Sequence, residues 1–512
     1  MADAKREIER KYEATPETRL PDLTRVPGVS AVVDKGVHEL DAVYYDTADL
    51  RLAAASITLR RRTGGSDAGW HLKLPVAPGV RDEIGVPLSD TLPRGLTSLV
   101  RARTRDTELL PVVRLRSLRQ IHHLVDGEGA LLAELSRDAV RAERLTEGGG
   151  PSAAWDEIEV ELADDGDPSF LDTVEKKLRK AGVNPAASPS KLARALAETA
   201  PEGAAVPKTT APPAPEHLRT AGDHVLAYLR EQADALLAYD PAVRRDLPDA
   251  VHQMRVATRR MRSAFKTFRK VIDRSVTDPV GEELKWLAAE LGVARDQEVL
   301  AERLRSRIDA LPRPRLLGPV RGRLRLWGVA HRSDARRRAV AVLDSKRYLA
   351  LLETLDALLG DPPLLKAAGG AAARVLPKAV LKDYDRLATR VHHALELPAG
   401  EARDLAMHEA RKAAKRARYA GEATTPALGK AARKFAKRMK AVQTVLGDHQ
   451  DSVVARDALR NLAIQAHAAG ESAFTWGLLY GQEEAAASQR EAELPQVWAK
   501  ASAPRLRADL SG

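Results

Sequence analysis

The chain has 512 residues, with 82 Lys and Arg against 71 Asp and Glu, a formal net charge of +11, no cysteine and 4% aromatic residues. The lack of cysteine excludes a disulfide framework, a thiolate metal site and a cysteine nucleophile. Residues 1–200 carry 29 basic and 33 acidic side chains, whereas residues 201–512 carry 53 and 38. This asymmetry indicates two regions with different electrostatic roles, the second of which attracts polyanions.

The N-terminal segment gives no sign of a targeting or membrane sequence. It is charged from Asp3 onward, and nowhere in the chain do about 18 apolar residues run together. We therefore expect a soluble protein of the cytoplasm.

Residues 1–200 alternate between short strand-like segments and turns rich in Gly, Pro and Asp. The strand-like segments are REIERKY, SITLRRR, WHLKLPV, PVVRLRSL, ALLAELS and WDEIEVEL. Helices are expected near 16–26, at 168–182 and in SKLARALAET. The segment 201–215 is rich in Pro and Ala and is expected to be a linker. Residues 216–512 have the composition and periodicity of an all-α domain.

Charged residues recur at alternate positions on most of the expected strands, and side chains two apart on a strand share a face. On one strand this alternation usually marks a solvated face. On five or six strands it predicts a barrel whose charged faces point inward, with a basic cradle beside a cluster of carboxylates. The bases suit phosphate oxygens, and the carboxylates suit a hard cation such as Mg²⁺ or Mn²⁺. The grouped residues are Glu7, Glu9 and Lys11; Arg60 and Arg62; His71 and Lys73; Arg81 and Glu83; Arg114 and Arg116; and Glu157, Glu159 and Glu161.

The order of these segments resembles the CYTH domain of the triphosphate tunnel metalloenzymes. Glu7-x-Glu9-x-Lys11 is followed by YYDTADLRL, TLRRRTGG, WHLKLP, RDE, EIEVEL and SKLARAL, over residues 5 to about 200. The resemblance implies an eight-stranded antiparallel tunnel and divalent-metal-dependent hydrolysis or transfer on triphosphates.

The roles that the resemblance implies are catalysis, substrate binding and metal binding. The catalytic set is Glu7, Glu9, Lys11, Arg60, Arg62 and Lys73, the substrate set is Arg81, Arg114, Arg116, Arg119 and Lys191, and the Mg²⁺ or Mn²⁺ set is Glu7, Glu9, Glu157, Glu159 and Glu161.

An internal repeat organises the second half. HQMRVATRRMR at 252–262 matches HEARKAAKRAR at 408–418, and LGVARDQEV from Leu291 matches LGDHQDSVV from Leu446. The separations from His252 to Leu291 and from His408 to Leu446 differ by one residue. Two motifs repeated in register predict two four-helix bundles of similar topology, related by a pseudo-twofold axis.

Each copy of the repeat places bases along one helical face. A single basic face is usually just solvated, but these faces are duplicated and mostly lack acidic partners one turn away. Nucleic acid is disfavoured because no aromatic residues interleave with the bases, and a membrane because the apolar face of these helices is Ala and Met. Linear polyphosphate remains as the partner. The candidate binding residues are His252, Arg255, Arg259, Arg262, Lys266, His408, Arg411, Lys412, Lys415, Arg418, Lys434 and Lys437.

The repeated motifs resemble the CHAD domain over about residues 216–500, which implies polyphosphate binding and association with polyphosphate granules. The sequence thus predicts an α+β protein with a CYTH-like tunnel at 1–200, a linker at 201–215 and a CHAD-like domain at 216–512. The expected function is metal-dependent hydrolysis of triphosphate or short polyphosphate. A non-catalytic polyphosphate-binding protein is the alternative, and the identity of the triphosphate and the formation of a homo-oligomer stay open.

Overall fold

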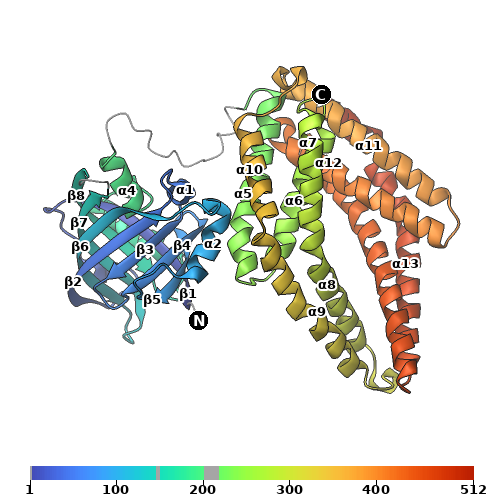
Figure 1. Ribbon diagram of the computed structural model, residues 1–512, viewed down its shortest axis with the longest axis horizontal. Coiled ribbons are helices and arrows are strands. Elements are labelled where there is room, and N and C mark those ends of the chain that lie inside the picture. The colour runs from blue at the N-terminus through green and yellow to red at the C-terminus, as the bar shows by residue number, and fades with distance from the viewer. Residues whose placement is uncertain (1–2, 146–149, 201–217, 512) are drawn as a thin grey trace. The chain divides into compact units, whose positions relative to one another are not determined.

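A computed structural model describes residues 3–145, 150–200 and 218–511 of the chain. The chain divides into two compact units, Met1–Ala211 and Pro212–Gly512. The predicted α+β class is confirmed, because an eight-stranded antiparallel barrel precedes a helical domain (Figure 1). The linker predicted at 201–215 lies outside the described residues.

The strands of the first unit form a closed barrel in the order β1-β5-β4-β3-β2-β6-β7-β8. Every neighbouring pair is antiparallel. The strands are β1 Asp3–Ala14, β2 Ala31–Asp46, β3 Thr58–Thr63, β4 Gly69–Ala77, β5 Val80–Pro87, β6 Leu110–Val125, β7 Leu131–Arg144 and β8 Ser152–Leu162.

Short helices cover the apolar side of this barrel, and one lies at its end. They are α1 Arg51–Ala54, α2 Arg94–Thr104, α3 Ser169–Lys180 and α4 Lys191–Glu198. Leu96 of α2 packs on Leu72 of β4, and Val174 of α3 packs among the outward residues of β7 and β8. By contrast, Leu192 of α4 joins a cluster of inward-facing side chains that includes Val113. Apolar side chains on the outer faces of the strands pack under these helices, whereas many charged side chains point to the interior.

The sequence prediction missed some elements of this unit. The helix expected near 16–26 is wrong, since only the 3-10 turn η1 Leu23–Arg25 forms there. Pro16, Pro21 and Pro27 remove backbone donors and restrict the residues before them. Strand β2 and helix α2 were not predicted, whereas α3 and α4 form where helices were expected.

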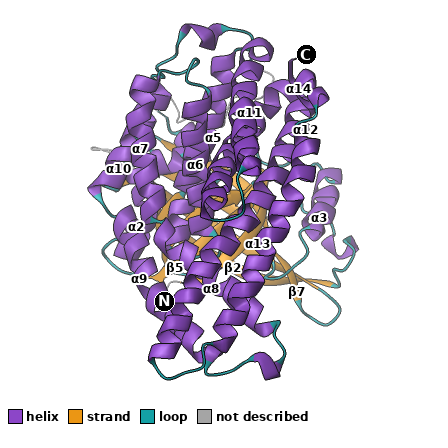
Figure 2. Ribbon diagram, turned by 90° about the vertical axis from the view of Figure 1, so that its right-hand side faces the viewer, coloured by secondary structure: helices purple, strands orange, loops and turns teal. Residues whose placement is uncertain are grey.

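The second unit is helical throughout its described residues (Figures 1 and 2). Its helices are α5 Ala221–Arg244, α6 Ala250–Thr267, α7 Arg274–Glu290, α8 Gly292–Asp309, α9 Val320–Leu343, α10 Lys346–Gly360, α11 Ala372–Glu396, α12 Glu401–Ala468, α13 Phe474–Ala501 and α14 Pro504–Ser511. The 3-10 turns η3 Arg313–Arg315 and η4 Lys366–Gly369 lie between helices.

The long helix α12 is two helices joined at Gly429, which has a φ of 58° and a ψ of −128°. Its two arms pack with α11, α13 and α14 around one core. A further core joins α8 and α9 to the second arm of α12 and to α13, through side chains such as Leu304 and Leu459. The two halves of the repeat therefore share a core in addition to their own packing. None of the described helices is both long and apolar enough to cross a membrane.

Candidate active site and anion groove

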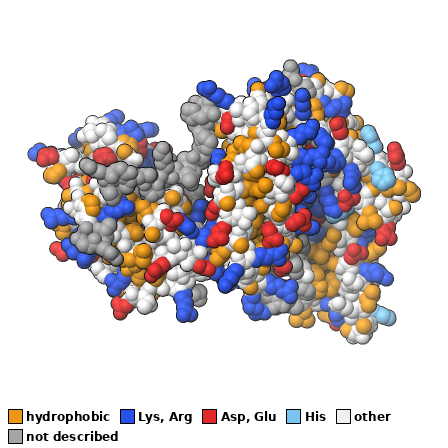
Figure 3. Space-filling view, turned by 45° about the horizontal axis from the view of Figure 1, so that its top comes forward, with side chains coloured by type: hydrophobic (Ala, Val, Ile, Leu, Met, Phe, Trp, Pro, Cys, Tyr) orange, Lys and Arg blue, Asp and Glu red, His pale blue; other side chains and the backbone are white. Residues whose placement is uncertain are grey.

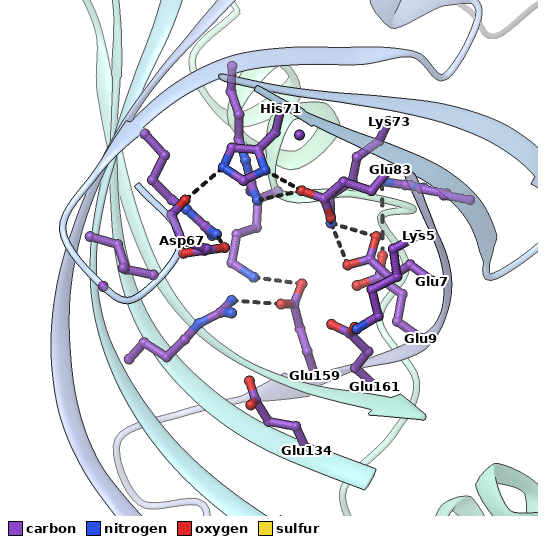
Figure 4. Close-up of a pocket in the computed structure, with 18 of the residues that line it drawn as sticks. Lys5, Glu7, Glu9, Asp67, His71, Lys73, Glu83, Glu134, Glu159 and Glu161 are labelled. Atoms are coloured by element: carbon purple, nitrogen blue, oxygen red, sulfur yellow. Dashed lines mark hydrogen bonds and ion pairs between the residues drawn. The ribbon is translucent and has the colours of Figure 1, made fainter. Parts of the chain in front are cut away.

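The barrel encloses a cavity of about 470 Å³ with charged walls (Figure 4). Bases from β3, β4 and β6 face carboxylates from β1 and β8 across the cavity, because alternate residues of each strand point inward. The charged side chains that line the cavity include Lys5, Glu7, Glu9, Arg60, Arg62, Asp67, His71, Lys73, Arg81, Glu83, Arg119, Glu134, Glu159, Glu161 and Lys191.

One ion cluster is centred on Lys73 of β4. Its Nζ donates to both carboxylate oxygens of Glu7 at 2.6 Å and lies 3.2 Å from Glu83. Burial disfavours the ammonium, but Glu7 and Glu83 outweigh burial and raise the pKa of Lys73. Lys73 therefore stays charged and holds the carboxylates of β1 and β5 together.

A second cluster is centred on Lys191, the first residue of α4. Its Nζ lies 2.9 Å from Asp138, 2.7 Å from Glu157 and 2.6 Å from Glu159. These carboxylates outweigh burial and raise the pKa of Lys191. Arg119 of β6 binds the fully buried Asp138 through two hydrogen bonds, at 2.8 and 2.7 Å, and also donates to Glu159 at 2.8 Å.

The residue Lys11 links the carboxylates of β1 and β8. Its Nζ donates to Glu9 at 2.9 Å and is also paired with Glu159. Lys11 and Glu157 face inward, as predicted, but they do not line the cavity itself.

The prediction for β6 is wrong at two positions. Arg114 and Arg116 lie on the outer face, where Asp41 is 2.5 Å from Arg114 and 3.8 Å from Arg116. The inward residues of β6 include Val113, which packs with α4. Arg119 is an odd number of residues from Arg114 and Arg116, so it faces the cavity when they face out.

Several residues of the barrel interior were not among the predicted site residues. Asp138 is an isolated acid beyond the expected strand ALLAELS, and Asp67 lies in the β3–β4 loop. His71 and Glu83 were placed on charged faces without a role. Their alternation with Lys73 and Arg81 was the available signal.

The inward carboxylates form two groups whose oxygen atoms fit a hard divalent cation. Glu9 and Glu161 are direct cross-strand partners on β1 and β8, an unfavourable pairing of like charges unless a cation lies nearby. Burial, together with the charge of Glu7, raises the pKa of Glu161 to about 7. The oxygen donors of Glu7, Glu9 and Glu161 are of the kind that Mg²⁺ and Mn²⁺ prefer. A second group, Asp138, Glu157 and Glu159, also places its carboxylate oxygens close together, and it is paired with Lys191 much as Glu7 is paired with Lys73 and Glu9 with Lys11.

A basic groove of about 590 Å³ crosses the helical unit where α6, α11 and α12 meet. Nine of its fourteen lining residues are Lys or Arg, and Glu409 is the single carboxylate among these lining residues. Figure 3 shows Lys and Arg side chains gathered on this unit. The basic residues are Arg259, Arg262, Lys266, Arg386, Arg390, Arg411, Lys412, Lys415 and Arg416.

The groove brings together part of the predicted set from both repeat copies. Arg259, Arg262, Lys266, His408, Arg411, Lys412 and Lys415 line it. Arg386 and Arg390 of α11 line it too and lie outside the repeat, and Arg416 lies within the repeat but was not among the predicted binding residues.

The remaining predicted bases lie elsewhere. Arg418 donates to Glu422 at 2.8 Å, Lys434 pairs with Asp509 of α14 at 3.2 Å, and Lys437 is exposed. His252 and Arg255 do not line the groove. The side chains of Arg295 and Asp296, in the first LG motif, lie outside the described residues.

The LG motifs place a glycine beside a repeat arginine in both halves. A Cβ on Gly292 would lie 2.7 Å from the guanidinium of Arg255, and one on Gly447 would lie 3.6 Å from that of Arg411. Gly292 therefore lets Arg255 pass close to the neighbouring helix, whereas a Cβ on Gly447 would make only an ordinary contact with Arg411.

Burial and crowded positive charge lower the pKa values of several basic residues in the groove. Burial and the charges of Arg411 and Arg259 lower the pKa of Lys415 to about 7. Burial and Arg262 lower the pKa of Lys266, and burial lowers that of His408, whose Nδ1 lies 2.6 Å from Gln450 Oε1. An anion in the groove would relieve this repulsion.

The buried Asp383 of α11 orients one wall of the groove. It lies 2.7 Å from Arg416 and 3.2 Å from Arg386, and it accepts a 2.5 Å hydrogen bond from Thr267 of α6. It thereby ties the helices that form the groove to one another.

The comparison with known families agrees with the division into two units. The family models of the CYTH domain and the CHAD domain match residues 5–196 and 227–460. The chain therefore belongs to the proteins that join a CYTH domain, the domain of the triphosphate tunnel metalloenzymes, to a CHAD domain.

Its relatives include two proteins of Mycobacterium tuberculosis, Uncharacterized protein MT2285 (strain CDC 1551) and Uncharacterized protein Rv2226 (strain H37Rv). Each is 40% identical over 491 residues, which cover 93% of this chain and 92% of the relative. Among solved structures, PptA from Streptomyces chartreusis has a TM-score of 0.46 and 23% identity over 55% of this chain and 99% of its own. The CHAD domain from the plant Ricinus communis has a TM-score of 0.39 and 29% identity over 57% of this chain and 91% of its own.

Proposed function

We propose that the barrel hydrolyses triphosphate or short-chain polyphosphate with Mg²⁺ or Mn²⁺. The observation that supports this most is the cavity itself, where buried Arg and Lys side chains face a set of crowded carboxylates. A linear polyanion with a divalent cation would neutralise both sets.

In this proposal the chain's own residues bind and orient the substrate. Arg60, Arg62 and Arg119 bind phosphate oxygens and stabilise the charge that develops on them. Glu7, Glu9 and Glu161 hold the cation, which when bound polarises the phosphate and lowers the pKa of a bound water. Lys73 donates to Glu7 and Lys11 donates to Glu9, and these contacts hold the two carboxylates in place.

The basic groove is proposed to bind inorganic polyphosphate and to associate the protein with polyphosphate granules in the cytoplasm. The lining of the groove supports this proposal. Its bases come from α6, α11 and α12, and Tyr419 is the one Phe, Trp or Tyr among the lining residues. Phosphate chains need only charge and hydrogen-bond donors, whereas single-stranded nucleic acid gains much of its affinity from stacking.

A substrate panel tests the catalytic proposal and its alternative. Phosphate release from tripolyphosphate, ATP and thiamine triphosphate is measured with Mg²⁺, with Mn²⁺ and with EDTA. Metal-dependent release supports the enzyme. Tight polyphosphate binding without release from any substrate would favour the alternative, a non-catalytic polyphosphate-binding protein. Competition between polyphosphate and DNA for the full chain tests the groove, and preference for DNA at equal salt would contradict the proposal.

A further inference from the structure

The loop at residues 64–68, between β3 and β4, lies against the barrel cavity. Gly65, Ser66 and Asp67 line the cavity, together with the strand residues. Gly64 has a φ of +81°, and a Cβ there would lie 2.1 Å from the carbonyl oxygen of Glu39. Because only glycine fits this approach to β2, the loop is held close to the barrel.

A barrel residue, His71, fastens the loop. Its Nε2 lies 2.8 Å from the carbonyl oxygen of Asp67, and its Nδ1 lies 2.5 Å from a carboxylate oxygen of Glu83 (Figure 4). A carbonyl oxygen can only accept, so Nε2 carries the hydrogen of this bond. His71 thus connects the loop backbone to β5 and fixes the position of the Asp67 backbone.

The side chain of Asp67 forms an ion pair with Arg62, an inward residue of β3. Arg62 has a side-chain exposure of only 6%, whereas Asp67 is half-exposed. Burial and the neighbouring charges of Arg60 and Arg119 lower the pKa of Arg62 to about 9. Arg62 is therefore an anion-binding group in a positively charged region, and a carboxylate from the loop already occupies it.

We propose that the Asp67 carboxylate stands in for a substrate phosphate on Arg62, and that competition between the two sets the affinity of the barrel for triphosphate. The inference rests on the proposed triphosphate site. A carboxylate and a phosphate both offer a guanidinium two oxygens, so both can bind Arg62 but not through the same N–H groups at once. A triphosphate brings more charge than one carboxylate, and it displaces Asp67 toward solvent, where half of this side chain already lies.

The test compares Asp67→Asn with a matched control, Asp90→Asn. Asp90 is fully exposed and lies 3.6 Å from Arg61, the outward neighbour of Arg62, so its substitution removes the same charge outside the cavity. The dissociation constant of tripolyphosphate is measured in EDTA, and its KM with Mg²⁺, on the full chain. Asp67→Asn is expected to lower both by about threefold to tenfold, while Asp90→Asn changes them by less than about twofold.

A second pair of variants shows whether the change arises in the barrel. In an Arg62→Gln background, Asp67→Asn is expected to leave the dissociation constant and KM of tripolyphosphate unchanged, because the guanidinium for which Asp67 and phosphate compete is absent. Unchanged or weaker binding by Asp67→Asn, or a gain that persists without Arg62, would overturn the inference. Thermal unfolding and a second variant, Asp67→Ala, exclude a folding defect. If the wild-type chain releases no phosphate and Arg62→Gln leaves tripolyphosphate binding unchanged, the proposed function itself fails.

Discussion

Polyphosphate binding to the groove should depend on pH through Lys415. In the free protein, burial, Arg411 and Arg259 lower the pKa of this lysine to about 7, and Arg255 adds to the effect while Asp451 opposes it. A bound polyanion reverses the balance of charge around the ammonium. The pKa of Lys415 should then return toward the ordinary lysine value of about 10.4.

The sign and size of the effect follow from proton linkage. Below pH 7 Lys415 is protonated both free and bound, so it adds no pH dependence. Above pH 7 the free form loses its proton and binding must take one up, so affinity falls by up to about tenfold per pH unit. Between pH 7 and pH 9 the loss is about 10-fold to 100-fold. The lowered pKa of His408 adds a smaller gain in affinity on the acid side.

Isothermal titration calorimetry with polyphosphate of defined length measures both affinity and proton uptake. Titrations at several pH values and constant ionic strength, each in two buffers of different ionisation enthalpy, give the number of protons bound. Constant ionic strength is needed because salt screens the same charges. We expect uptake of about one proton at pH 8.5.

Two lysine-to-arginine variants show whether Lys415 causes the pH dependence. Lys415→Arg introduces the residue found at the matching repeat position, Arg259, and arginine does not titrate in this range. It should flatten the pH dependence above 7. Lys412→Arg, at an exposed groove lysine paired with Glu409, should leave the dependence unchanged. Wild-type affinity that is constant from pH 7 to 9, or an unaltered slope in Lys415→Arg, would refute the reasoning.

Three further predictions follow from the packing. Lys191→Met leaves three inward carboxylates without their shared cation and should cost about 3 to 5 kcal/mol of stability at neutral pH. The loss should shrink in acid unfolding experiments, as the carboxylates become protonated. Asp383→Asn should lower the free energy of unfolding by about 1 to 3 kcal/mol in denaturant titrations, since charged hydrogen bonds are lost. Gly292→Ala should displace the end of the Arg255 side chain and lower the melting temperature in thermal unfolding, whereas Gly447→Ala makes an ordinary contact and should not. Equal effects of the two alanines would contradict the proposed use of the LG motifs.

The barrel interior was largely predictable because the two-residue period of a strand is strict. Charged residues at alternate positions placed Glu7, Arg60, Lys73 and Glu159 inside, and the structure brings them together. The rule failed on β6, where arginines occur at positions of both parities. Which face is inward there depends on α4, whose leucines fill the end of the barrel beside Val113. That contact is tertiary and leaves no local pattern.

Site residues that have no charged neighbours two positions away in the sequence were harder to predict. Asp138 and Asp67 have no charged alternate neighbours that would mark them, and they are recognised only by their contacts with Arg119 and Arg62. In the helical unit, the repeat identified bases on α6 and α12 but not Arg386 on α11. The wall formed by α11 follows from helix packing and not from the repeated motif.

Phosphate release from tripolyphosphate by the full chain tests the central claim most directly. The measurement compares Mg²⁺ with EDTA, and the wild type with Glu9→Gln, which keeps the shape of the side chain but removes one carboxylate from the proposed cation site. The account predicts steady release by the wild type with Mg²⁺, none with EDTA, and a loss of at least about 100-fold in Glu9→Gln. Release that persists in EDTA or in Glu9→Gln would contradict it.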